Sequence, residues 1–594
     1  MKLLNSLILV YVFIYLIAHG QENIINITNN NKIYTIKTSE LKESLKYQEI
    51  PRTASCNLKQ ADDLISGKMV FLKRFPAVPY NTNILSWKEN PYQNRSWQLS
   101  YENLRHVSIL NACYEKTHND QYHTTAKDIV LSYIKTHPSF DVETSEFSWS
   151  DHAIAYRTLH ILETLSHELE QKDNNSTFIQ KSFDHLGLNT EFMMDDKNHY
   201  IHNHSLMMDR SLIALSKVYK PQKELSSALK QKGLSRSVIL FNQMIDETGL
   251  VKEHSIGYQI LNHNFFKDVF QLLDYSEIDK ETMSSFNKMP EILEMLVKPD
   301  LSFPIWGDSK KINLTKNIVK NFDNNPRLKA ILDSSLELNS TVSFINNIGV
   351  IRDKKNDFYL AFFANYYSKV HKHHDDLSFV LQFDKVDIFT DAGMYGYEKK
   401  YRPLLMSSLF HNTISINGKD YKINKKGQYA KIVDYKKSQQ YEMIKGEHNF
   451  YDDKIVERTI YYIKPNAIVL IDKVKGKGIK TIQQVFNLGE NANLLKNQDR
   501  QIKFKFNDTL SVVIQQYKEA DQKIYYGNKD RGFVSQKYSE ITPIYQLEFN
   551  TNIKEFLTSI IISSNKAVNP ITEIKIQNSK IIYKINNTWH SLDT

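Results

Sequence analysis

Apolar residues change their spacing once along this chain, from a helical period to a period of two. Between about residues 83 and 338 they recur every three or four positions, the spacing of amphipathic helices. In two of these runs the apolar residues that share one helix face are Ile154, Ile161, Leu162 and Leu165, and then Met208, Leu212, Leu215 and Tyr219. Residues 83–338 are therefore predicted to form an α-domain.

After about Asn339 the pattern alternates. Leu377, Phe379, Leu381 and Phe383 occupy every second position, as in a β-strand. The runs TISINGKDY and TIYYIKPNAIVLID predict strands that turn at Asn417-Gly418 and at Lys464-Pro465-Asn466. Residues 339–594 are thus predicted to be antiparallel β, in stacked sheets. Because helices come first and strands follow without alternation, a doubly wound α/β fold is disfavoured.

The first twenty residues, MKLLNSLILVYVFIYLIAHG, have the pattern of a secretory signal peptide. A lysine precedes an apolar stretch from Leu7 to Ile17, and Ala18-His19-Gly20 resembles a cleavage site, so cleavage is expected after Gly20. A membrane anchor is the alternative, although the apolar run is shorter than the ~18 residues of a spanning helix. We expect a secreted or periplasmic protein with no membrane partner once the signal is removed. Residues 21–82 are polar at first and are predicted to be a leader and an arm that packs on the helices.

Length, charge and cysteine content narrow the picture further. A chain of 594 residues exceeds the roughly 250–300 residues that one core supports, which favours two large domains. The net charge of +9 is spread without Lys/Arg blocks, which argues against a nucleic-acid partner; an acidic polysaccharide and ordinary solubilising charge both remain open. Cys56 and Cys113 allow at most one disulfide, and two unpaired thiols are equally compatible.

Two polar clusters in the helical half could carry chemistry. In HNHSLMMDR, His202, Asn203 and His204 immediately precede an amphipathic run, and asparagine and histidine could donate hydrogen bonds to a carboxylate. The alternative is an N-cap asparagine with solvated histidines. In EHSIGYQILNH, His254 and Tyr258 flank Gly257, and the alternative is a tyrosine packed in the core. The chain contains no phosphate-binding G-x-x-x-x-G-K-[ST], no G-x-S-x-G and no paired C-x-x-C, so nucleotide and acyl-transfer chemistry lose their usual support.

The β half has a histidine cluster in HKHHDDLSF. If this run enters a strand, His371 and His373 point to one side and His374 to the other. Two histidines on the same side are a plausible metal or acid/base pair. A histidine, Asp391 at a strand end and His411 at a strand start would make a three-ligand zinc site with a fourth position open. The alternative is a solvated histidine patch neutralised by the aspartates.

These stretches resemble a known family. The C-terminal region of heparinase II/III-like polysaccharide lyases is similar to two stretches of this chain, HKHHDDLSFVLQFDKVDIFTDAGMYGY followed by SSLFHNTISING. The family and this chain both have H-x-H-x-D-x-L-S-F, D-x-G and H-N-T in the same order. Toroid elements of heparan sulfate lyases and oligoalginate lyases resemble three further stretches, NHSLMMDRSLIALS, EHSIGYQ and LSFPIWGDS. SWQLSYENLRHVSIL and SEFSWSDHAIAYR resemble their early helices. Together the matches cover most of residues 85–480.

The resemblance implies an incomplete (α/α) toroid followed by an antiparallel β-sandwich, and β-elimination at C4 of a hexuronic acid. In this reading Asn203 and His204 bind the uronate carboxylate. Tyr258 is the acid and could also serve as the base, with His371 facing it. The phenol pKa is expected to be drawn down toward the working pH near His204 and His371.

The resemblance also implies a structural divalent metal, held by His373, Asp391 and His411. Zinc is the expected ion and calcium the alternative. Two departures are noted: relatives often carry a small residue where this chain has His374, and the sequence does not choose among Tyr395, Tyr397 and Tyr401 as an auxiliary hydroxyl.

Three classes of function follow. The first is an exported lyase, with a heparan- or heparosan-like substrate placed ahead of oligoalginate. The second is a glycan-binding relative without turnover. The third is a glycoside hydrolase, which needs two opposed carboxyl groups about 5–9.5 Å apart. Asp375 and Asp376 fit it poorly, because neighbours on a strand point to opposite faces. Endo or exo action, syn or anti elimination and the oligomeric state stay open.

Overall fold

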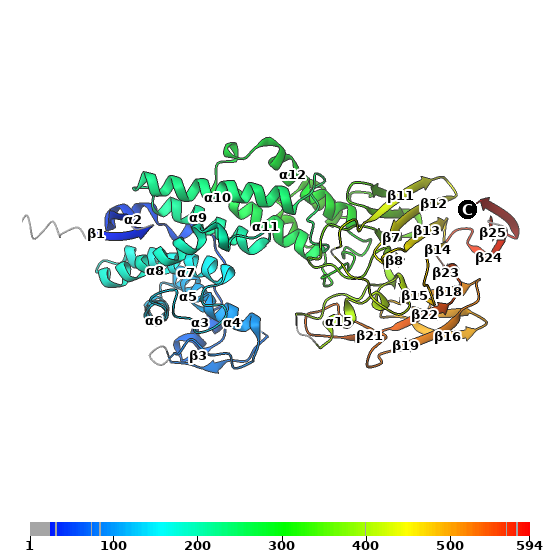
Figure 1. Ribbon diagram of the computed structural model, residues 1–594, viewed down its shortest axis with the longest axis horizontal. Helices are drawn as coiled ribbons and strands as arrows, with labels where there is room; N and C mark the ends of the chain where they lie inside the picture. Colours follow the sequence, from blue (N-terminus) through cyan, green and yellow to red (C-terminus); the bar gives the residue numbers. More distant parts are fainter. Residues whose placement is uncertain are drawn as a thin grey trace, which may run out of the picture. The chain divides into compact units, whose positions relative to one another are not determined.

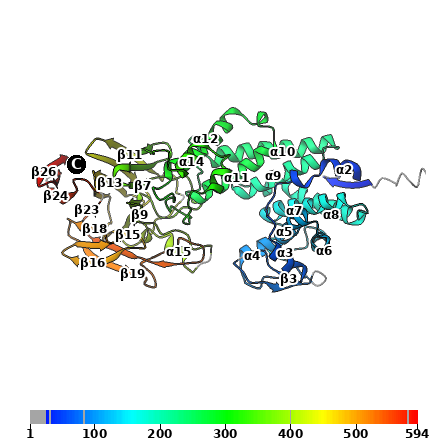
Figure 2. The same cartoon turned by 180° about the vertical axis from the view of Figure 1, so that it is seen from behind.

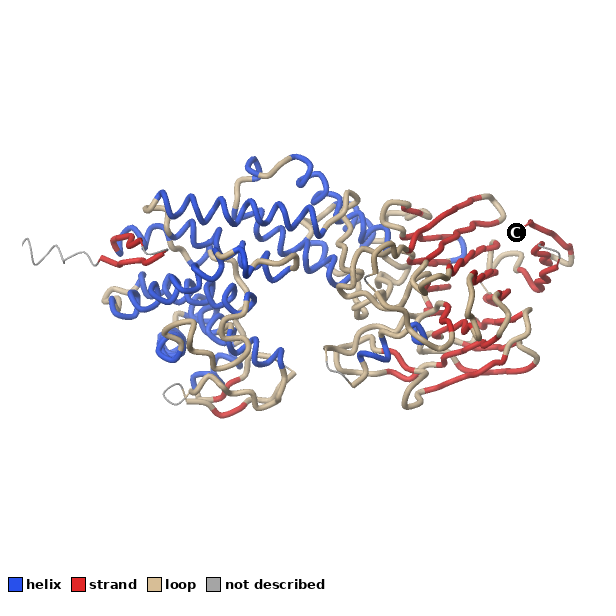
Figure 3. The backbone as a smooth tube through the Cα atoms, in the orientation of Figure 1, coloured by secondary structure: helices blue, strands red, loops and turns tan. Residues whose placement is uncertain are grey.

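The computed structural model describes residues 24–29, 32–72, 74–81, 85–397, 400–423, 425–565, 567–577 and 580–593. The predicted signal peptide lies outside them. The chain divides into two compact units, one of Met1–Gln243 with Phe265–Asp279, the other of Met244–Asn264 with Lys280–Thr594. Figure 3 shows helices in blue through the first unit and strands in red through most of the second. None of the helices in the described ranges has both the length and the apolar character needed to cross a bilayer.

The first unit is mainly helical. Its helices are α2 Thr38–Ser44, α3 Leu58–Ile65, α4 Arg95–Glu102, α5 Arg105–Thr117, α6 Asp120–Thr136, α7 Asp151–Glu170, α8 Ser176–Met194 and α9 Asn203–Val218. Two more helices, α10 Lys223–Met244 and α11 Ile256–Leu272, contribute residues to both units. Asparagines start several of them: the Asn119 side chain accepts a hydrogen bond from the Gln121 amide, and that of Asn175 from the Phe178 amide. The many asparagines of the sequence thus supply N-caps.

Helix α7 lies at the centre of the first unit. It is in contact with α4, α5, α6, α8 and α9, and both views of the ribbon show it among them (Figures 1 and 2). The four apolar residues predicted for its buried face are all buried, and so are most of its polar ones. The helical period was therefore predicted correctly. The helix is central rather than amphipathic because neighbours cover it on all sides.

The N-terminal segment packs on these helices through a hairpin. Strands β1 Ile24–Asn29 and β2 Lys32–Lys37 pair antiparallel, and Ile25 and Ile27 are buried in the same core as the helices. Strand β1 contacts α8, where a side chain at Gly187 would approach the Thr28 carbonyl oxygen to 2.9 Å. The only other strands of this unit in the described ranges are β3 Lys68–Met69 and β4 Val78–Pro79.

A disulfide joins Cys56, which precedes α3, to Cys113 in α5, with the two Cα atoms 4.5 Å apart. The bridge closes a sequence separation of 57 residues, for which the chain-entropy model gives about 4 kcal/mol of stabilisation. We expect the double variant Cys56→Ala/Cys113→Ala to lose about this much of its free energy of unfolding, and therefore to unfold at a lower denaturant concentration. Reducing agent should destabilise the wild type but not the variant, and equal sensitivity of both would contradict the bridge.

The second unit contains stacked layers. Helices α12 Lys280–Leu296, α13 Lys316–Asn321 and α14 Pro326–Leu332 are followed by a five-stranded sheet of β5 Thr341–Ser343, β6 Ile348–Asp353, β7 Phe358–Phe363, β8 Ser378–Phe383 and β9 Val386–Phe389. An eight-stranded sheet has the order β11 Ala430–Lys437, β12 Tyr441–His448, β13 Ile455–Ile463, β14 Ala467–Lys475, β23 Glu555–Ser564, β18 Leu510–Gln516, β17 Gln501–Lys505 and β16 Asn493–Gln498.

Smaller sheets and a short helix complete this unit. A four-stranded sheet has the order β10 Ile414–Ile416, β15 Ile482–Asn487, β22 Tyr545–Thr551 and β19 Asp521–Tyr526, and a three-stranded sheet contains β24 Ile571–Gln577, β25 Lys580–Ile585 and β26 Thr588–Asp593. Strands β20 Phe533–Val534 and β21 Thr542–Pro543 pair, and α15 covers Arg402–Leu405. Strands begin at Thr341, near the predicted change at residue 339, whereas α12–α14 belong to the same compact unit as the sheets.

Burial explains the layering. Val350, Ala361 and Val380 lie in a core shared with α12–α14, while Leu360, Phe379 and other inward residues lie in a core shared with the larger sheet. Every residue of β7 and β8 is therefore buried, on both faces of the sheet. The alternation read from the sequence shows the strand, but it does not show that helices cover its second face.

The two predicted turns have different outcomes. Strands β13 and β14 form a hairpin in which Ile463 pairs with Ala467, so the turn at Lys464-Pro465-Asn466 is confirmed. Asn417 and Gly418 do turn, both with positive φ. The predicted hairpin is nevertheless wrong, because β10 pairs with β15 and only a single bridge, Ile416 with Lys419, follows the turn. The Asn417 side chain instead accepts hydrogen bonds from the amides of Lys480 and Thr481.

Candidate active site residues

The predicted residues fall in both compact units, and each group is described by itself. In the first unit His202, not Asn203, is the N-cap of α9, because its Nδ1 accepts a hydrogen bond from the His204 amide at 3.2 Å. Asn203 is the first helical residue, and its side-chain amide makes no hydrogen bond to the described chain. The alternative interpretation of Asn203 as a cap is therefore wrong, and its amide is available to a ligand.

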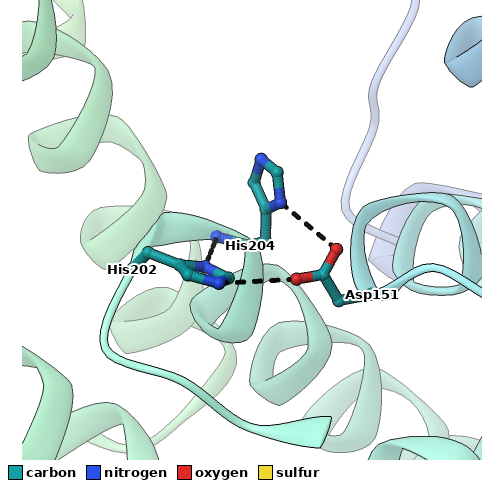
Figure 4. A group of neighbouring side chains, drawn as sticks. All are labelled: Asp151, His202 and His204. Atoms are coloured by element: carbon teal, nitrogen blue, oxygen red, sulfur yellow. Dashed lines mark hydrogen bonds and ion pairs between the residues drawn. The ribbon is translucent and has the colours of Figure 1, made fainter. Parts of the chain in front are cut away.

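Asp151, the first residue of α7, contacts both neighbouring histidines (Figure 4). Its Oδ1 lies 3.2 Å from His204 Nδ1, and its Oδ2 lies 3.6 Å from His202 Nε2. Burial alone would raise the pKa of Asp151, but the hydrogen bond and positive charge of His204 hold it below the ordinary value. An ionised Asp151 keeps a hydrogen on His204 Nδ1, so the imidazolium form can donate from Nε2. Sequence reasoning missed Asp151.

In the second unit, His254 ties the start of α11 to the loop before His371. Its Nδ1 donates to the Val370 carbonyl at 3.1 Å, and its Nε2 accepts from the Tyr367 amide at 3.0 Å. Burial lowers the pKa of His254 to about 3, so the ring is neutral, as these two bonds require. This residue therefore has a structural role, which brings Tyr258 next to His371.

Tyr258 and His371 are stacked, with ring centroids 3.6 Å apart and planes inclined by 19°. The Tyr258 hydroxyl lies 2.5 Å from that of Tyr397, so Tyr397 is the one of the three tyrosines that contacts Tyr258 through its hydroxyl. Tyr395 and Tyr401 pack in a small apolar cluster instead.

The predicted lowering of the Tyr258 pKa is wrong. Burial raises the pKa of Tyr258, and the neighbouring Tyr397 and Asp308 act in the same direction. A phenolate here would lose water and face a carboxylate, while its hydrogen-bonding partner is a neutral hydroxyl. Tyr258 therefore stays protonated at working pH, and the hydroxyl still carries the proton that a general acid must donate.

Asp308 connects the groups around His371. Its buried carboxylate accepts from His371 Nδ1 at 2.8 Å, from His373 Nε2 at 2.9 Å, and from both terminal nitrogens of Arg402 at 2.7 and 2.8 Å. Burial would raise the pKa of Asp308, but these hydrogen bonds hold it far below the ordinary value. The ionised carboxylate fixes the hydrogen of His371 on Nδ1. In the neutral ring the lone pair is then on Nε2, where a general base needs it.

The glycine before Asp308 permits this arrangement. Gly307 has φ +51°, and a Cβ there would lie 2.1 Å from the His254 carbonyl oxygen and 2.8 Å from that of His371. The WGD sequence thus places Asp308 against two backbone segments that only glycine can approach. Asp308 and Arg402 were both missed by sequence reasoning, although Asp308 lies in the family-like stretch LSFPIWGDS.

The HKHHDD run is a loop, not a strand entrance, and β8 begins only at Ser378. His371 has φ +53°, so the period-two argument for its side chain is wrong. His371 and His373 still meet because both reach Asp308. His374 contacts the Met406 and Tyr421 carbonyls instead.

Asp375 and Asp376 do not support a hydrolase. Both are buried beside Lys372, whose ammonium group contacts Asp375 and lies 3.3 Å from Asp376 Oδ2. They are therefore part of a buried ion network, and the reason for setting them aside is burial rather than strand geometry.

The residues predicted to bind a metal fit such an ion in part. His373 donates from Nε2 to Asp308, and His411 donates from Nδ1 to Asp391 at 3.0 Å. Their remaining nitrogens, His373 Nδ1 and His411 Nε2, are buried without a partner among the described residues, and the ring centroids lie 5.3 Å apart. A carboxylate behind each ring is typical of histidines that bind zinc.

Asp391 is the exception in this set. Its oxygens face His411 Nδ1 and the Ser378 hydroxyl. Among the described residues the group with three ligand atoms within 4.8 Å of one another is a different one, Asp151, His202 and His204. Direct ligation by Asp391 thus needs a rearrangement, because its oxygens are already engaged as hydrogen-bond acceptors. The zinc site stays a prediction.

Chelation tests it. We expect a chelator to lower the melting temperature of the purified protein, because removing an ion that binds only the folded state removes its stabilisation. His373→Ala should abolish the chelator's effect, whereas the matched variant His374→Ala should retain it. Elemental analysis that finds no metal in protein purified without chelator would contradict the site.

Comparisons with known proteins identify the family of this chain. Residues 28–330 match the family Heparinase II/III N-terminus, and residues 338–577 match Heparinase II/III-like, C-terminal. The chain belongs to the heparinase II/III family of polysaccharide lyases. The sequence has no significant match among curated proteins.

Solved structures show the same fold. A crystal structure of heparinase III aligns with TM-score 0.76 and 15% identity over 93% of this chain and 94% of that one. A heparan sulfate lyase from Pedobacter heparinus aligns with TM-score 0.72 and 15% identity over 93% of each chain. A chondroitinase AC lyase aligns at TM-score 0.51 and 11% identity, over 92% of this chain and 86% of that one. The predicted fold class, an (α/α) toroid followed by an antiparallel β-sandwich, is confirmed.

Proposed function

We propose that this lyase is exported and cleaves a uronic-acid polysaccharide of the heparan sulfate or heparosan type. The resemblance to heparan sulfate lyases supports the substrate class. The disulfide and the apolar N-terminal sequence support export, since disulfides persist in oxidising compartments. A net charge of +9 would attract an acidic polymer.

The first requirement of β-elimination is neutralisation of the uronate carboxylate. The C5 proton is barely acidic until the neighbouring carboxylate accepts strong hydrogen bonds, because negative charge moves onto that group as the proton leaves. The Asn203 amide, which makes no hydrogen bond within the described chain, and the His204 ring, when it carries a hydrogen on Nε2, are suited to this task. Asp151 positions His204 for it through Nδ1.

The second requirement is a pair of proton transfers. His371 Nε2, oriented by Asp308, takes the C5 proton, and the electrons of the C5–H bond form the C4=C5 double bond. The C4–O4 bond breaks, and O4 receives the Tyr258 hydroxyl proton. The products are a 4,5-unsaturated uronate and a new chain end. The observation that carries the proposal is the stacked Tyr258–His371 pair, with Tyr397 at the phenol and Asp308 at the imidazole.

The sugar epimer decides how this pair is used. In glucuronate H5 and O4 lie on the same side, so Tyr258 could return to O4 a proton taken from C5. In iduronate they lie on opposite sides, so a separate base and acid are needed. The raised pKa of Tyr258 favours the separate base, His371.

The decisive experiment is incubation with heparan sulfate, heparosan, chondroitin sulfate, hyaluronan and oligoalginate, followed by the ultraviolet absorbance of unsaturated uronate. We expect turnover on heparan sulfate or heparosan. Activity confined to alginate would transfer the proposal to an oligoalginate lyase. Binding without absorbance on any polymer would establish a glycan-binding protein and overturn the lyase function.

A further inference from the structure

We propose that Asp151, His202 and His204 form an inhibitory site for a divalent transition metal ion of the zinc type. The three side chains extend from the starts of α7 and α9, and one ligand atom of each lies within 4.8 Å of the other two (Figure 4). This group lies wholly in the first compact unit and shares no residue with the metal site predicted around His373. Two imidazoles and one carboxylate are a donor set that zinc prefers over calcium or magnesium.

Two distances in this group are close to those between the ligands of a tetrahedral ion, each measured from a different oxygen of Asp151. With Zn–N and Zn–O bonds of about 2.0–2.2 Å, two ligands of one tetrahedral zinc lie about 3.3–3.5 Å apart. Asp151 Oδ1 lies 3.2 Å from His204 Nδ1, and Asp151 Oδ2 lies 3.6 Å from His202 Nε2. An ion on Asp151 would replace the hydrogen bond to His204. Because one ligand atom of each residue lies within 4.8 Å of the other two, small movements of the side chains would bring all three to the ion. One position of the tetrahedron stays open to water.

Solvent reaches all three ligands. The exposed side-chain fractions are 36% for His202, 41% for His204 and 21% for Asp151, so an ion can enter without opening the fold. Two features oppose binding. Metal at His202 Nε2 moves the ring hydrogen to Nδ1 and breaks the cap bond to the His204 amide, and the N-termini of α7 and α9 disfavour a cation. Reversible binding is the expected consequence.

Occupancy removes His204 from its proposed task. With zinc on Nδ1 and its ring fixed by the ion, His204 no longer makes its hydrogen bond to Asp151, and a substrate carboxylate would become a competing zinc ligand. This part of the inference rests on the proposed function, whereas metal binding itself does not. We expect zinc to inhibit elimination and a chelator to reverse the inhibition.

The experiment compares the wild type with His202→Asn. Asparagine keeps the N-cap, because its side chain also accepts a hydrogen bond from the first helical turn, but it lacks the imidazole ligand. The matched control is His118→Asn, which replaces an exposed histidine in the left-handed C-cap of α5, a conformation that asparagine tolerates. Each protein is stripped of metal and titrated with Zn²⁺ by calorimetry, and with Co²⁺, whose visible absorption reports tetrahedral coordination.

We expect His202→Asn to lose one Zn²⁺ site, with affinity reduced about 100-fold or more, since losing even an outer-shell partner costs about 10–100-fold. His118→Asn should titrate as the wild type does. Equal Zn²⁺ and Co²⁺ titrations for His202→Asn and the wild type would overturn the site. If the site binds metal but zinc leaves turnover unchanged, the inhibitory role is overturned and the metal site stands. Absence of turnover in metal-free protein would contradict the proposed function only. The metal site would still stand or fall by the calorimetric comparison of His202→Asn with the wild type.

Discussion

Replacing Tyr258 by phenylalanine is expected to lower kcat by about 10²–10⁴-fold, the usual contribution of a positioned general acid. The substitution removes only the hydroxyl. The ring that stacks on His371 at 3.6 Å stays in place, and the melting temperature should change little. Steady-state absorbance assays and thermal unfolding of the same preparations measure the two effects. Near-wild-type turnover with unchanged melting temperature would return Tyr258 to a packing role.

Tyr397→Phe is the matched control for this variant. It removes the hydroxyl that contacts Tyr258 but leaves the proton donor itself, and its ring is 52% exposed. A neutral hydrogen bond contributes about 1 kcal/mol net, so we expect a loss of roughly tenfold or less. A loss equal to that of Tyr258→Phe would show that the two hydroxyls act as one unit, and that the proton donor cannot be assigned to Tyr258 alone.

His371→Gln separates the roles of acid and base. If Tyr258 serves as both on a glucuronate-type sugar, His371→Gln should leave measurable turnover on heparosan. If His371 is the base, as the raised pKa of Tyr258 favours, the variant should lose glucuronate and iduronate cleavage alike. Comparing heparosan with iduronate-rich heparan sulfate decides between them.

The sequence was sufficient for the fold because its signals are local and repeated. The change from a 3.6-residue to a two-residue period located the switch from helices to sheets, and Lys464-Pro465-Asn466 located a hairpin. The sequence did not predict that α7 and β8 are buried on every side, because that burial depends on neighbours distant in the chain. It failed at Asn417, where the turn is right but the partner strand, β15, comes from more than sixty residues later.

Histidine and tyrosine residues could be predicted as catalytic candidates from the sequence, whereas the residues that position them could not. Asp308, Arg402 and Asp151 are common residue types whose roles arise only from contacts across long sequence separations. The direction of the Tyr258 pKa shift was also out of reach. It depends on burial and on a carboxylate, Asp308, that lies fifty residues away in sequence.

Asn203→Ala should lower kcat by about 10²–10³-fold, or about 2.7–4 kcal/mol, by analogy with the loss of one oxyanion donor. The Asn203 amide has no partner in the described chain, so its removal should cost little stability. The effect should fall on kcat more than on KM, because the donor is worth most once charge has developed on the carboxylate.

Asn175→Ala is the matched control, with the opposite pattern expected. Asn175 caps α8 by accepting from the Phe178 amide at 3.0 Å, and its loss should cost about 1 kcal/mol of stability while leaving kcat unchanged. If Asn203→Ala instead lowers the melting temperature as Asn175→Ala does, Asn203 stabilises its helix. If it changes KM alone, the amide binds the substrate equally in the ground and transition states. Only a loss in kcat at constant stability places Asn203 at the carboxylate where charge develops.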